Sequence, residues 1–264
     1  MSSTASASCD IAAKFRLEGR VALVTGAGRG IGRSAAVALA QAGAEVWLLA
    51  RTAAEIEQAA AEIRAVGGSA RAVACDVTDA AAVNRVVSAV PVLDVLVNNA
   101  GMNIPEPFVE VSEANFDRVL DLNVRAMFLV AQAAVKKMLQ TPDRKARGGV
   151  IINITSQMGH VGAPRRTVYC LTKHAIEGFT KALAVELAMH NIRVNSIAPT
   201  FLDTPMTQPM FARPEFAKWV LDRIPMGRLG QLGEVAAAVV FVASEAASLM
   251  TGTSLVIDGG WTAQ

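Results

Sequence analysis

Tyr169 and Lys173 are the pair of residues whose types and spacing most directly suggest chemistry. They open and close the run Tyr169-Cys170-Leu171-Thr172-Lys173 inside an Ala-rich stretch of helical period, and residues at i and i+4 lie on one face of a helix. A free phenol has a pKa of about 10, and a neighbouring fixed cation favours the phenolate. We therefore expect Lys173 to lower the pKa of Tyr169, so that the phenol can exchange a proton with a substrate oxygen.

A hydroxyl group that could assist this pair belongs to Ser156, which lies 13 residues before Tyr169. It directly follows the apolar run Val150–Thr155, which has the composition of a buried strand. A residue in this place lies at the carboxyl edge of a parallel sheet, where doubly wound folds bind their ligands. Ser156 could hydrogen-bond a substrate oxygen there, although a serine after a strand is also a common turn or capping residue.

A glycine-rich turn stands near the start of the chain. The apolar run Val21–Thr25 continues into the residues GAGRGIG at 26–32 and then into an Ala-rich helical stretch. Glycines at the start of a helix let the backbone approach a phosphate, and the helix N-terminus favours the negative charge. With a strand before it and a helix after it, this turn predicts a site for the pyrophosphate of a dinucleotide.

The residues at the end of the second apolar run indicate whether the dinucleotide is NAD or NADP. An acid there holds the ribose 2′-hydroxyl of NAD, whereas an arginine accepts the 2′-phosphate of NADP. This chain has Ala50 followed by Arg51, and Arg29 adds a second cation inside the glycine turn. We expect NADP(H) to be preferred and NAD(H) to remain usable. The alternative is that Arg51 is a solvated surface residue and the 2′ site is permissive.

Short apolar runs alternate with longer Ala-rich stretches from Arg20 onward, which is typical of βαβ units around a parallel sheet. The predicted strands are Val21–Thr25, Glu45–Ala50, Ala70–Cys75, Val92–Asn98, Val150–Thr155, Ile192–Ala198 and Ser254–Asp258. The predicted helices are Ile31–Ala42, Ala53–Val66, Ala80–Val90, Ser112–Gln140, Thr167–His190 and Glu234–Ser244. Because the strands are nearly all continuously apolar, both faces of the sheet must be covered. We therefore predict an α/β fold, with a doubly wound seven-stranded parallel sheet and helices on both faces.

Two segments fall outside this rhythm. Thr200–Gly230 contains four prolines and several large apolar residues where a simple crossover would be much shorter, and insertions of this kind are commonly lids or binding loops. The first residues lack the basic start and the apolar run of a secretory signal. We expect residues 1–14 to be a disordered tail and residues 15–264 to form a single domain, with residues 200–230 as its substrate lid.

The composition argues against several functional classes. Apolar residues make up 52% of the chain and charged residues 18%, which is enough apolar material for a large core. Lysine and arginine total 25 against 23 for aspartate and glutamate, without charge blocks, so we expect no nucleic-acid partner. No apolar stretch approaches the roughly 18 residues of a membrane span. The dispersed cysteines and histidines predict no metal site and a reducing, cytoplasmic setting.

Together these motifs resemble the short-chain dehydrogenase/reductase family, whose glycine pattern is TGxxxGxG. The resemblance extends from about Leu17 to Gln264. Its ordered landmarks are Thr25-Gly26 with Gly30 and Gly32, Asp76, Asn98-Asn99-Ala100-Gly101, Asn123, Ser156, Tyr169, Lys173 and the ending Ile257-Asp258-Gly259-Gly260-Trp261. One departure is visible, because relatives usually have Pro-Gly after the sixth strand and this chain has Pro199-Thr200. The loop beside the nicotinamide is therefore expected to differ from theirs.

The resemblance implies a single-domain Rossmann fold and hydride transfer between a nicotinamide and a carbonyl or secondary alcohol. Ser156 would polarise the carbonyl and Tyr169 would protonate it, while Lys173 would tune the phenol and bind the nicotinamide ribose. Asn123 would hold a water that connects Lys173 to solvent. The cofactor-binding residues that it implies are Gly26, Arg29, Gly30, Ile31, Gly32, Arg51, Asp76, Val77, Asn99, Ala100, Gly101, Tyr169, Lys173, Pro199 and Thr200.

The substrate is less constrained than the cofactor. The segment before Tyr169 and the lid should surround it, and the candidate substrate contacts are Gln157, His160 and Met206. His160 or either of the adjacent arginines Arg165 and Arg166 could bind a carboxylate or phosphate, or could be a solvated loop residue. The large apolar residues of the lid could cover a ketone or could pack onto the domain.

The family resemblance leaves several functions open. Two substrate types are common among relatives, namely 3-oxoacyl thioesters and sugar acids or polyols of the gluconate dehydrogenase kind. A non-catalytic NADP-binding redox sensor or assembly subunit is the alternative, although such proteins often lose the tyrosine or lysine. The long apolar helices predicted at Ser112–Gln140 and Thr167–His190 resemble the dimer seam of the family, so we expect a homotetramer or homodimer.

Overall fold

The computed structural model describes residues 10–205 and 207–263. The strands are β1 (Val21–Thr25), β2 (Glu45–Ala50), β3 (Ser69–Ala74), β4 (Val95–Asn98), β5 (Gly149–Ile154), β6 (Ile192–Pro199) and β7 (Ser254–Ile257). The helices are α1 (Gly30–Gln41), α2 (Ala53–Ala65), α3 (Ala80–Ala89), α4 (Glu113–Leu120), α5 (Met127–Leu139), α6 (Arg144–Arg147), α7 (Thr167–Leu187), α8 (Gln208–Phe211), α9 (Pro214–Leu221) and α10 (Leu232–Ala243).

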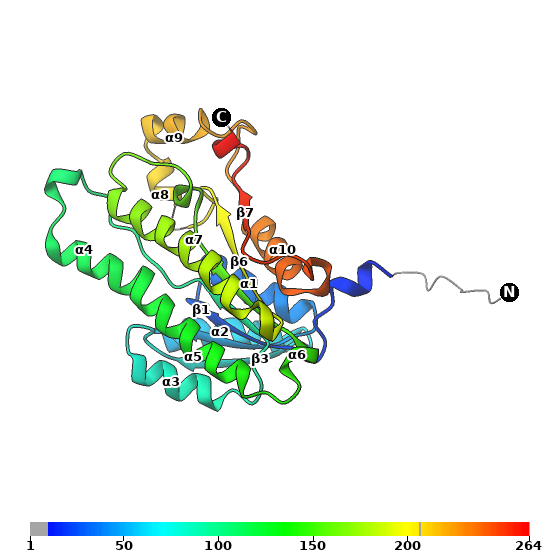
Figure 1. Ribbon diagram of the computed structural model, residues 1–264. Coiled ribbons are helices and arrows are strands. Elements are labelled where there is room, and N and C mark those ends of the chain that lie inside the picture. The colour runs from blue at the N-terminus through cyan, green and yellow to red at the C-terminus, as the bar shows by residue number, and fades with distance from the viewer. Residues whose placement is uncertain (1–9, 206, 264) are drawn as a thin grey trace.

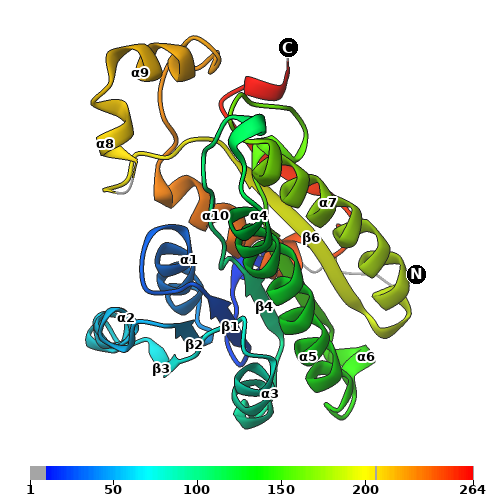
Figure 2. The same ribbon diagram turned by 90° about the vertical axis from the view of Figure 1, so that its left-hand side faces the viewer.

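All seven strands form one parallel sheet in the order β3-β2-β1-β4-β5-β6-β7. Both faces are covered, and each face has its own apolar core. Side chains of α1, α2 and α10 form one core, and side chains of α3, α5 and α7 form the other, with the sheet between the two helical layers (Figures 1 and 2). The predicted doubly wound Rossmann-like fold is confirmed.

The predicted helix Ser112–Gln140 is divided in the structure. An α-helix runs over Glu113–Leu120, a π-helical segment follows at Asp121–Ala126, and a second α-helix continues over Met127–Leu139. A π-helical turn is wider than an α-helical one and commonly marks a functional site. The candidate residue Asn123 lies inside this wider segment.

The predicted strand Val92–Asn98 starts three residues late, at Val95. Asp94 explains the difference, because it meets β1 through its side chain as well as its backbone. Its carboxylate accepts a hydrogen bond from the Val21 N–H at 2.9 Å, and its own N–H donates to the Val21 carbonyl. The buried carboxylate thus occupies the position where strand pairing would otherwise begin.

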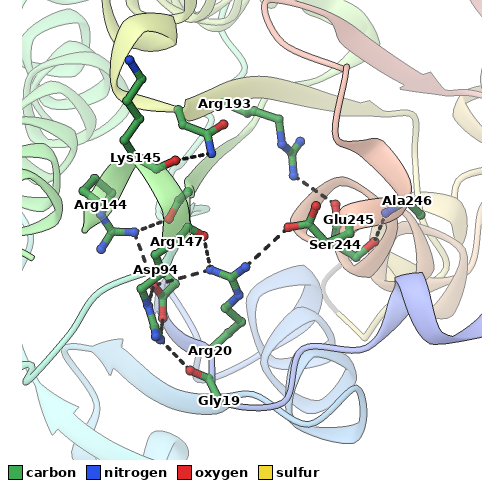
Figure 3. A network of polar contacts seen from close by, with 12 residues as sticks. Gly19, Arg20, Asp94, Arg144, Lys145, Arg147, Arg193, Ser244, Glu245 and Ala246 are labelled. Atoms are coloured by element: carbon green, nitrogen blue, oxygen red, sulfur yellow. Dashed lines mark hydrogen bonds and ion pairs between the residues drawn. The ribbon is translucent and has the colours of Figure 1, made fainter. Parts of the chain in front are cut away.

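Asp94 is also the centre of a polar network at the amino ends of the strands (Figure 3). Its carboxylate accepts hydrogen bonds from Arg147 Nε at 2.6 Å and from Arg147 Nη2 at 2.7 Å. Nη1 of the buried Arg144 lies 3.4 Å from Oδ1 of the same carboxylate. Arg144 also donates to the carbonyls of Met138 and Leu93. These bonds connect β1, β4 and the loop before β5 at the edge opposite the candidate site.

The segment Thr200–Gly230 is closed at its base by a bridge between Leu202 and Gly230. It contains α8 and α9, which project beyond the sheet on the side where the C-terminus lies (Figures 1 and 2). Its aromatic side chains pack with Trp261 near the chain end. The insertion therefore shares a small apolar core with Trp261 and Val161 of the main domain.

The structure describes the predicted tail at residues 1–14 only from Asp10 onward. Residues 1–9 lie outside the described part of the chain, but Ala12–Phe15 form a short 3-10 helix. The Phe15 ring lies 6.2 Å from the ring of Phe241 on α10. Among residues 10–205 and 207–263, no helix is long and apolar enough to cross a membrane, and no three potential metal-ligating side chains gather.

Candidate active site

The predicted site residues follow the carboxyl ends of strands that are neighbours in the sheet. Gly26 follows β1, Arg51 follows β2, Asn99 follows β4, Ser156 lies just beyond β5 and Thr200 follows β6. In a parallel sheet these ends lie along a single edge, so segments far apart in the sequence meet there. The order of the sheet places the β4 end beside the β1 end and the β5 end beside the β4 end.

Ser156 is held in place by its neighbour Gln157. The Ser156 hydroxyl donates to Gln157 Oε1 at 2.8 Å and accepts from the Met158 N–H at 3.1 Å. Both Ser156 and Gln157 are buried. Gln157, predicted as a substrate contact, therefore orients the serine in this structure.

Tyr169 and Lys173 lie on one face near the start of α7, as their spacing predicted. Lys173 Nζ is 5.5 Å from the centroid of the Tyr169 ring, and it donates a hydrogen bond to the Ile154 carbonyl at 2.9 Å. Ile154 is the last residue of β5, two residues before Ser156. The lysine thus ties the helix that carries the phenol to the strand that leads to the serine.

The electrostatics of Tyr169 differ from the expectation. Burial raises the pKa of Tyr169 to about 12, and the hydrogen bond with Ser156 and the charge of Arg166 oppose that rise. Burial also lowers the pKa of Lys173 to about 8, against the effect of Glu177. The predicted lowering of the tyrosine pKa by Lys173 is therefore wrong for this structure, because the ammonium lies over the ring and is bonded to a carbonyl. The cation that favours the phenolate is Arg166.

Both the oxygen and the nitrogen of the Asn123 side-chain amide form hydrogen bonds. Its Oδ1 accepts from the Met102 N–H at 2.8 Å, and its Nδ2 donates to the Met102 carbonyl at 2.8 Å and to Thr172 Oγ1 at 3.2 Å. The Thr172 hydroxyl in turn donates to the Tyr169 carbonyl. Asn123 therefore braces the loop after β4 against the first turns of α7, and its predicted role in holding a water stays a prediction.

The glycine turn forms an open cradle at the N-terminus of α1. A Cβ atom on Gly32 would collide with the Gly26 carbonyl, so only glycine permits this close approach. Gly30 has a φ of +55°, and nothing lies within 4 Å of where its Cβ would be. The N-cap residue Arg29 makes no side-chain capping bond, which leaves backbone N–H groups of the first turn for a ligand. These features fit a dinucleotide pyrophosphate.

Comparison with known proteins agrees with this geometry. Residues 26–262 match the family model described as enoyl-(acyl carrier protein) reductase. L-xylulose reductase of Bos taurus is 40% identical over 251 residues, which cover 94% of this chain and 99% of the relative. This chain belongs to the short-chain dehydrogenase/reductase family. It is accordingly an NAD(P)-dependent oxidoreductase that acts on alcohol or carbonyl groups.

Two further relatives differ in what their names describe. Cyclopentanol dehydrogenase of Comamonas testosteroni is 41% identical over 252 residues, covering 94% of this chain and 99% of the relative. The crystal structure of a gluconate 5-dehydrogenase from Burkholderia cenocepacia J2315, in complex with NADP and tartrate, superposes with a TM-score of 0.89. It is 34% identical and covers 95% of this chain and 98% of its own. This short-chain dehydrogenase thus has relatives named for neutral sugars, cyclic alcohols and sugar acids.

Asn99 stabilises the glycine turn of the short-chain dehydrogenase from the neighbouring strand. Its Nδ2 donates to the carbonyls of Thr25 and Gly26 at 2.9 and 3.1 Å, and its N–H donates to the Thr25 hydroxyl at 3.0 Å. The Ala100 N–H also donates a hydrogen bond to the Thr25 hydroxyl. These hydrogen bonds hold the backbone of the glycine turn in place. Asn99 therefore shapes the predicted cofactor site by positioning that backbone.

The adenosine side of the predicted cofactor site carries two exposed arginines, Arg29 and Arg51. Neither forms an ion pair within the described residues. Asp76 lies nearby: hydrogen bonds from the backbone and side chain of Thr78 and the Arg51 charge keep its pKa low, against burial. Sequence reasoning missed Glu55, whose Oε2 lies 2.6 Å from where a Cβ on Gly28 would be. The only sequence signal for Glu55 was its position four residues after Arg51, in the first turn of α2.

The departure at Pro199-Thr200 has a structural counterpart. The Thr200 side chain is buried, and among the described residues its Oγ1 is the one buried side-chain oxygen or nitrogen without a hydrogen-bond partner. Its backbone N–H donates to the Ile257 carbonyl, which anchors the loop to β7. A buried hydroxyl without a partner is costly, and a bound cofactor could satisfy it.

The predicted substrate contacts are dispersed. His160 Nε2 lies 2.9 Å from Ser254 Oγ and 3.4 Å from Glu177 Oε1, so the ring faces β7 and α7. Met206 lies outside the described residues. The sequence analysis missed Glu177, although it is four residues after Lys173; its carboxylate accepts from Thr155 and Ser196 at 2.6 Å each.

The lid aromatics pack mainly against one another. Phe201 lies 6.0 Å from Phe211 and 5.8 Å from Phe216 between ring centroids, both in edge-on arrangements. Trp219 lies 5.5 Å from Trp261. Of the two roles left open for these residues, packing is the one this structure displays.

Proposed function

We propose that this short-chain dehydrogenase uses NADP(H) to interconvert a secondary alcohol and its carbonyl compound, with Tyr169 as the proton-transferring residue. The observation that carries the proposal is the convergence of Ser156, Tyr169 and Lys173 at the carboxyl end of β5, on the same edge of the sheet as the glycine cradle after β1, with β4 between them. When bound there, the nicotinamide supplies or accepts a hydride, and the protein supplies orientation and proton transfer.

Each residue of the site has a role in this scheme. Ser156, oriented by Gln157, hydrogen-bonds the reacting oxygen of the substrate. The Tyr169 hydroxyl gives that oxygen a proton in carbonyl reduction and removes one in alcohol oxidation. Lys173, held by the Ile154 carbonyl, keeps two donors for the ribose of the cofactor. Asn123 keeps α7 and the loop after β4 in register.

The preference for NADP(H) is supported by Arg29 and Arg51, both exposed and without an ion-pair partner among the described residues. An NADP 2′-phosphate would give these guanidinium groups a dianionic partner. The Burkholderia relative was crystallised with NADP. Glu55 acts in the opposite direction, because its carboxylate lies against Gly28 of the same turn.

The remaining cofactor contacts are assigned from the positions of the candidate residues along the carboxyl edge of the sheet. We assign the pyrophosphate to Gly26, Gly30, Ile31 and Gly32, the adenosine to Asp76 and Val77, and the nicotinamide half to Ala100, Gly101, Pro199 and Thr200. The orphaned Thr200 hydroxyl supports the last assignment. The non-catalytic alternative is disfavoured because Asn123, Ser156, Tyr169 and Lys173 are all present.

We also propose self-association into a homotetramer or homodimer. Large apolar side chains are exposed along α4, α5 and α7, where a second copy could cover them; they are Phe116, Phe128, Leu139, Leu171 and Val185. Closed symmetric assembly is the usual way in which such faces are buried.

The experiment that tests the activity is an absorbance assay of NADPH and NADH turnover. The panel contains simple ketones, 3-oxoacyl thioesters, sugar acids and polyols, in both reaction directions. Turnover of at least one panel member by the wild type and loss of that turnover in Tyr169→Phe is the expected result. No turnover of any member, with the cofactor shown to bind, would contradict the proposal.

A further inference from the structure

Arg166 is a buried cation at the start of the helix that carries the proposed proton donor. It is the N-cap residue of α7, three positions before Tyr169, and only 7% of its surface is exposed. The adjacent Arg165 is exposed and has a φ of +61°. The two arginines that the sequence could not distinguish therefore differ sharply in environment.

Arg166 has no acidic partner among residues 10–205 and 207–263. None of the ion pairs formed by those residues includes it. The one hydrogen bond that its side chain donates there is a long one, 3.5 Å from Nη1 to the Arg165 carbonyl. A guanidinium carries five N–H donors, and buried charges are normally paired. Arg144 shows the usual arrangement in this chain, with Asp94 and several carbonyls around it.

The surroundings of Arg166 favour an anion. The α7 helix is 21 residues long and its first turn lacks a side-chain cap, so unpaired N–H groups and the positive end of the helix dipole lie at the same place. The charge of Arg166 acts on the phenol, where it favours the ionised form, and burial lowers the pKa of Arg166 itself. Arg166 and Tyr169 are also three residues apart at the start of α7, and residues at this spacing are neighbours on a helix surface, so a group that Arg166 binds lies at the end of α7 that carries the phenol.

We propose that Arg166 binds the carboxylate of the substrate, so that the enzyme acts on hydroxy or keto acids such as sugar acids. This inference rests on the proposed oxidoreductase function and specifies its substrate class. A carboxylate matches a single guanidinium in charge and in bidentate geometry. The cofactor phosphates do not compete for this residue, because their cradle lies at the start of α1, after β1. A neutral polyol or ketone would leave the buried charge unpaired.

The test measures binding apart from turnover. Isothermal titration of the protein with NADPH bound, which cannot oxidise an alcohol, uses three acids, gluconate, tartrate and 3-hydroxybutyrate, and two neutral alcohols, xylitol and cyclopentanol. The variants are Arg166→Gln, Arg166→Lys and the matched control Arg165→Gln, which removes the same charge from an exposed neighbour. We expect at least one acid to bind, to lose about 30-fold or more in affinity in Arg166→Gln, and to regain part of it in Arg166→Lys. Arg165→Gln should stay within about threefold of the wild type.

Three outcomes would overturn the inference. They are the absence of binding by every acid, equal acid affinity in the wild type and Arg166→Gln, and equal loss in Arg165→Gln. Thermal melting checks that each variant folds, and Arg166→Lys keeps the test valid if Arg166→Gln does not. Acid binding that depends on Arg166, without turnover of any alcohol or carbonyl, would reject the oxidoreductase scheme and retain the acid site. Turnover of xylitol or cyclopentanol with no Arg166-dependent acid binding would reject the acid site and retain the oxidoreductase scheme.

Discussion

The Lys173 ammonium lies over the ring of Tyr169, 5.5 Å from its centroid, and donates its hydrogen bond to the Ile154 carbonyl rather than to the phenol. The lysine therefore positions α7 against β5, while Ser156 and the charge of Arg166 oppose the rise that burial causes in the pKa of Tyr169. This division of contacts separates the proposed proton donor from the residue that anchors the helix. It leads to distinct expectations for each.

Tyr169→Phe should abolish most of the chemistry and leave the protein intact. The substitution removes one oxygen and keeps the ring, so folding and NADPH binding should persist. Turnover should fall by roughly 10²–10⁴-fold, the usual effect of losing a general acid. Initial rates and NADPH titration on the same preparation measure the two properties. Near-normal turnover would mean that another residue donates the proton, and Ser156 would be the next to test.

The two directions of the reaction should respond differently to pH. Alcohol oxidation needs the phenolate as proton acceptor. Because burial raises the pKa of Tyr169 to about 12, the phenolate fraction grows about tenfold per pH unit between about pH 6 and pH 7.5, where Lys173, with its pKa lowered to about 8, is still mainly protonated. Carbonyl reduction needs the phenol, which predominates throughout that range. Oxidation rates should therefore rise with pH while reduction rates stay nearly flat. A plateau of the oxidation rate near neutral pH would contradict this.

Arg51→Ala should weaken NADPH binding by about tenfold or more and leave NADH binding almost unchanged, since only NADPH carries the 2′-phosphate. Glu55→Gln provides the matched control of opposite sign, because it removes a carboxylate that lies against the glycine turn. It should tighten NADPH binding relative to NADH. Fluorescence titration with both cofactors gives the four dissociation constants. Equal effects of Arg51→Ala on NADPH and NADH would remove the assignment of this arginine to the 2′ site.

Asp94→Asn should destabilise the fold without touching the candidate site. Asp94 is 1% exposed, and its loss would leave the buried Arg144 without its acid, at a cost of about 3 kcal/mol or more in the free energy of unfolding. The matched control is Asp222→Asn, which removes the exposed ion pair with Lys218 and should change stability by less than about 1 kcal/mol. Denaturant unfolding of both variants measures the difference.

The same carboxylate predicts a pH dependence of that difference. Burial tends to raise the pKa of Asp94, but hydrogen bonds from Arg147 and Val21 and the charges of both arginines lower it overall. A lowered folded-state pKa stabilises the protein above the unfolded value of about 3.9 and is lost as the pH falls through the folded value. The gap between wild type and Asp94→Asn should therefore narrow in acid. A gap that widens below about pH 4 would assign the effect to another group.

Val185→Glu should weaken self-association while the monomer stays folded, because Val185 lies on α7 and is 82% exposed in a single chain. A charge at the centre of an apolar contact is costly, whereas at an exposed position it is tolerated. Sedimentation velocity should show the wild type above the 27.7 kDa of one chain and the variant shifted toward it. A wild type that remains monomeric at micromolar concentration would reject the proposed assembly.

The fold could be predicted from the sequence because its determinants are local and periodic. Continuous apolar runs such as Glu45–Ala50 and Ile192–Ala198 indicate strands buried on both faces, and the Ala-rich segments between them have helical period. The glycine spacing and the i, i+4 relation of Tyr169 and Lys173 are likewise properties of one short segment. The structure confirms the seven-stranded sheet and brings these segments to one edge.

What only the tertiary structure decided concerns contacts between distant segments. The adjacent residues Arg165 and Arg166 have the same side chain, yet Arg165 is exposed and Arg166 is buried at the start of α7. Glu177 forms hydrogen bonds with Thr155 and Ser196, and Asn123 in its π-helical turn binds the backbone of Met102. The pKa of Tyr169 rises with burial instead of falling with its i+4 lysine. Burial, desolvation and side-chain partners depend on which elements pack together, and a pattern confined to one segment does not contain that information.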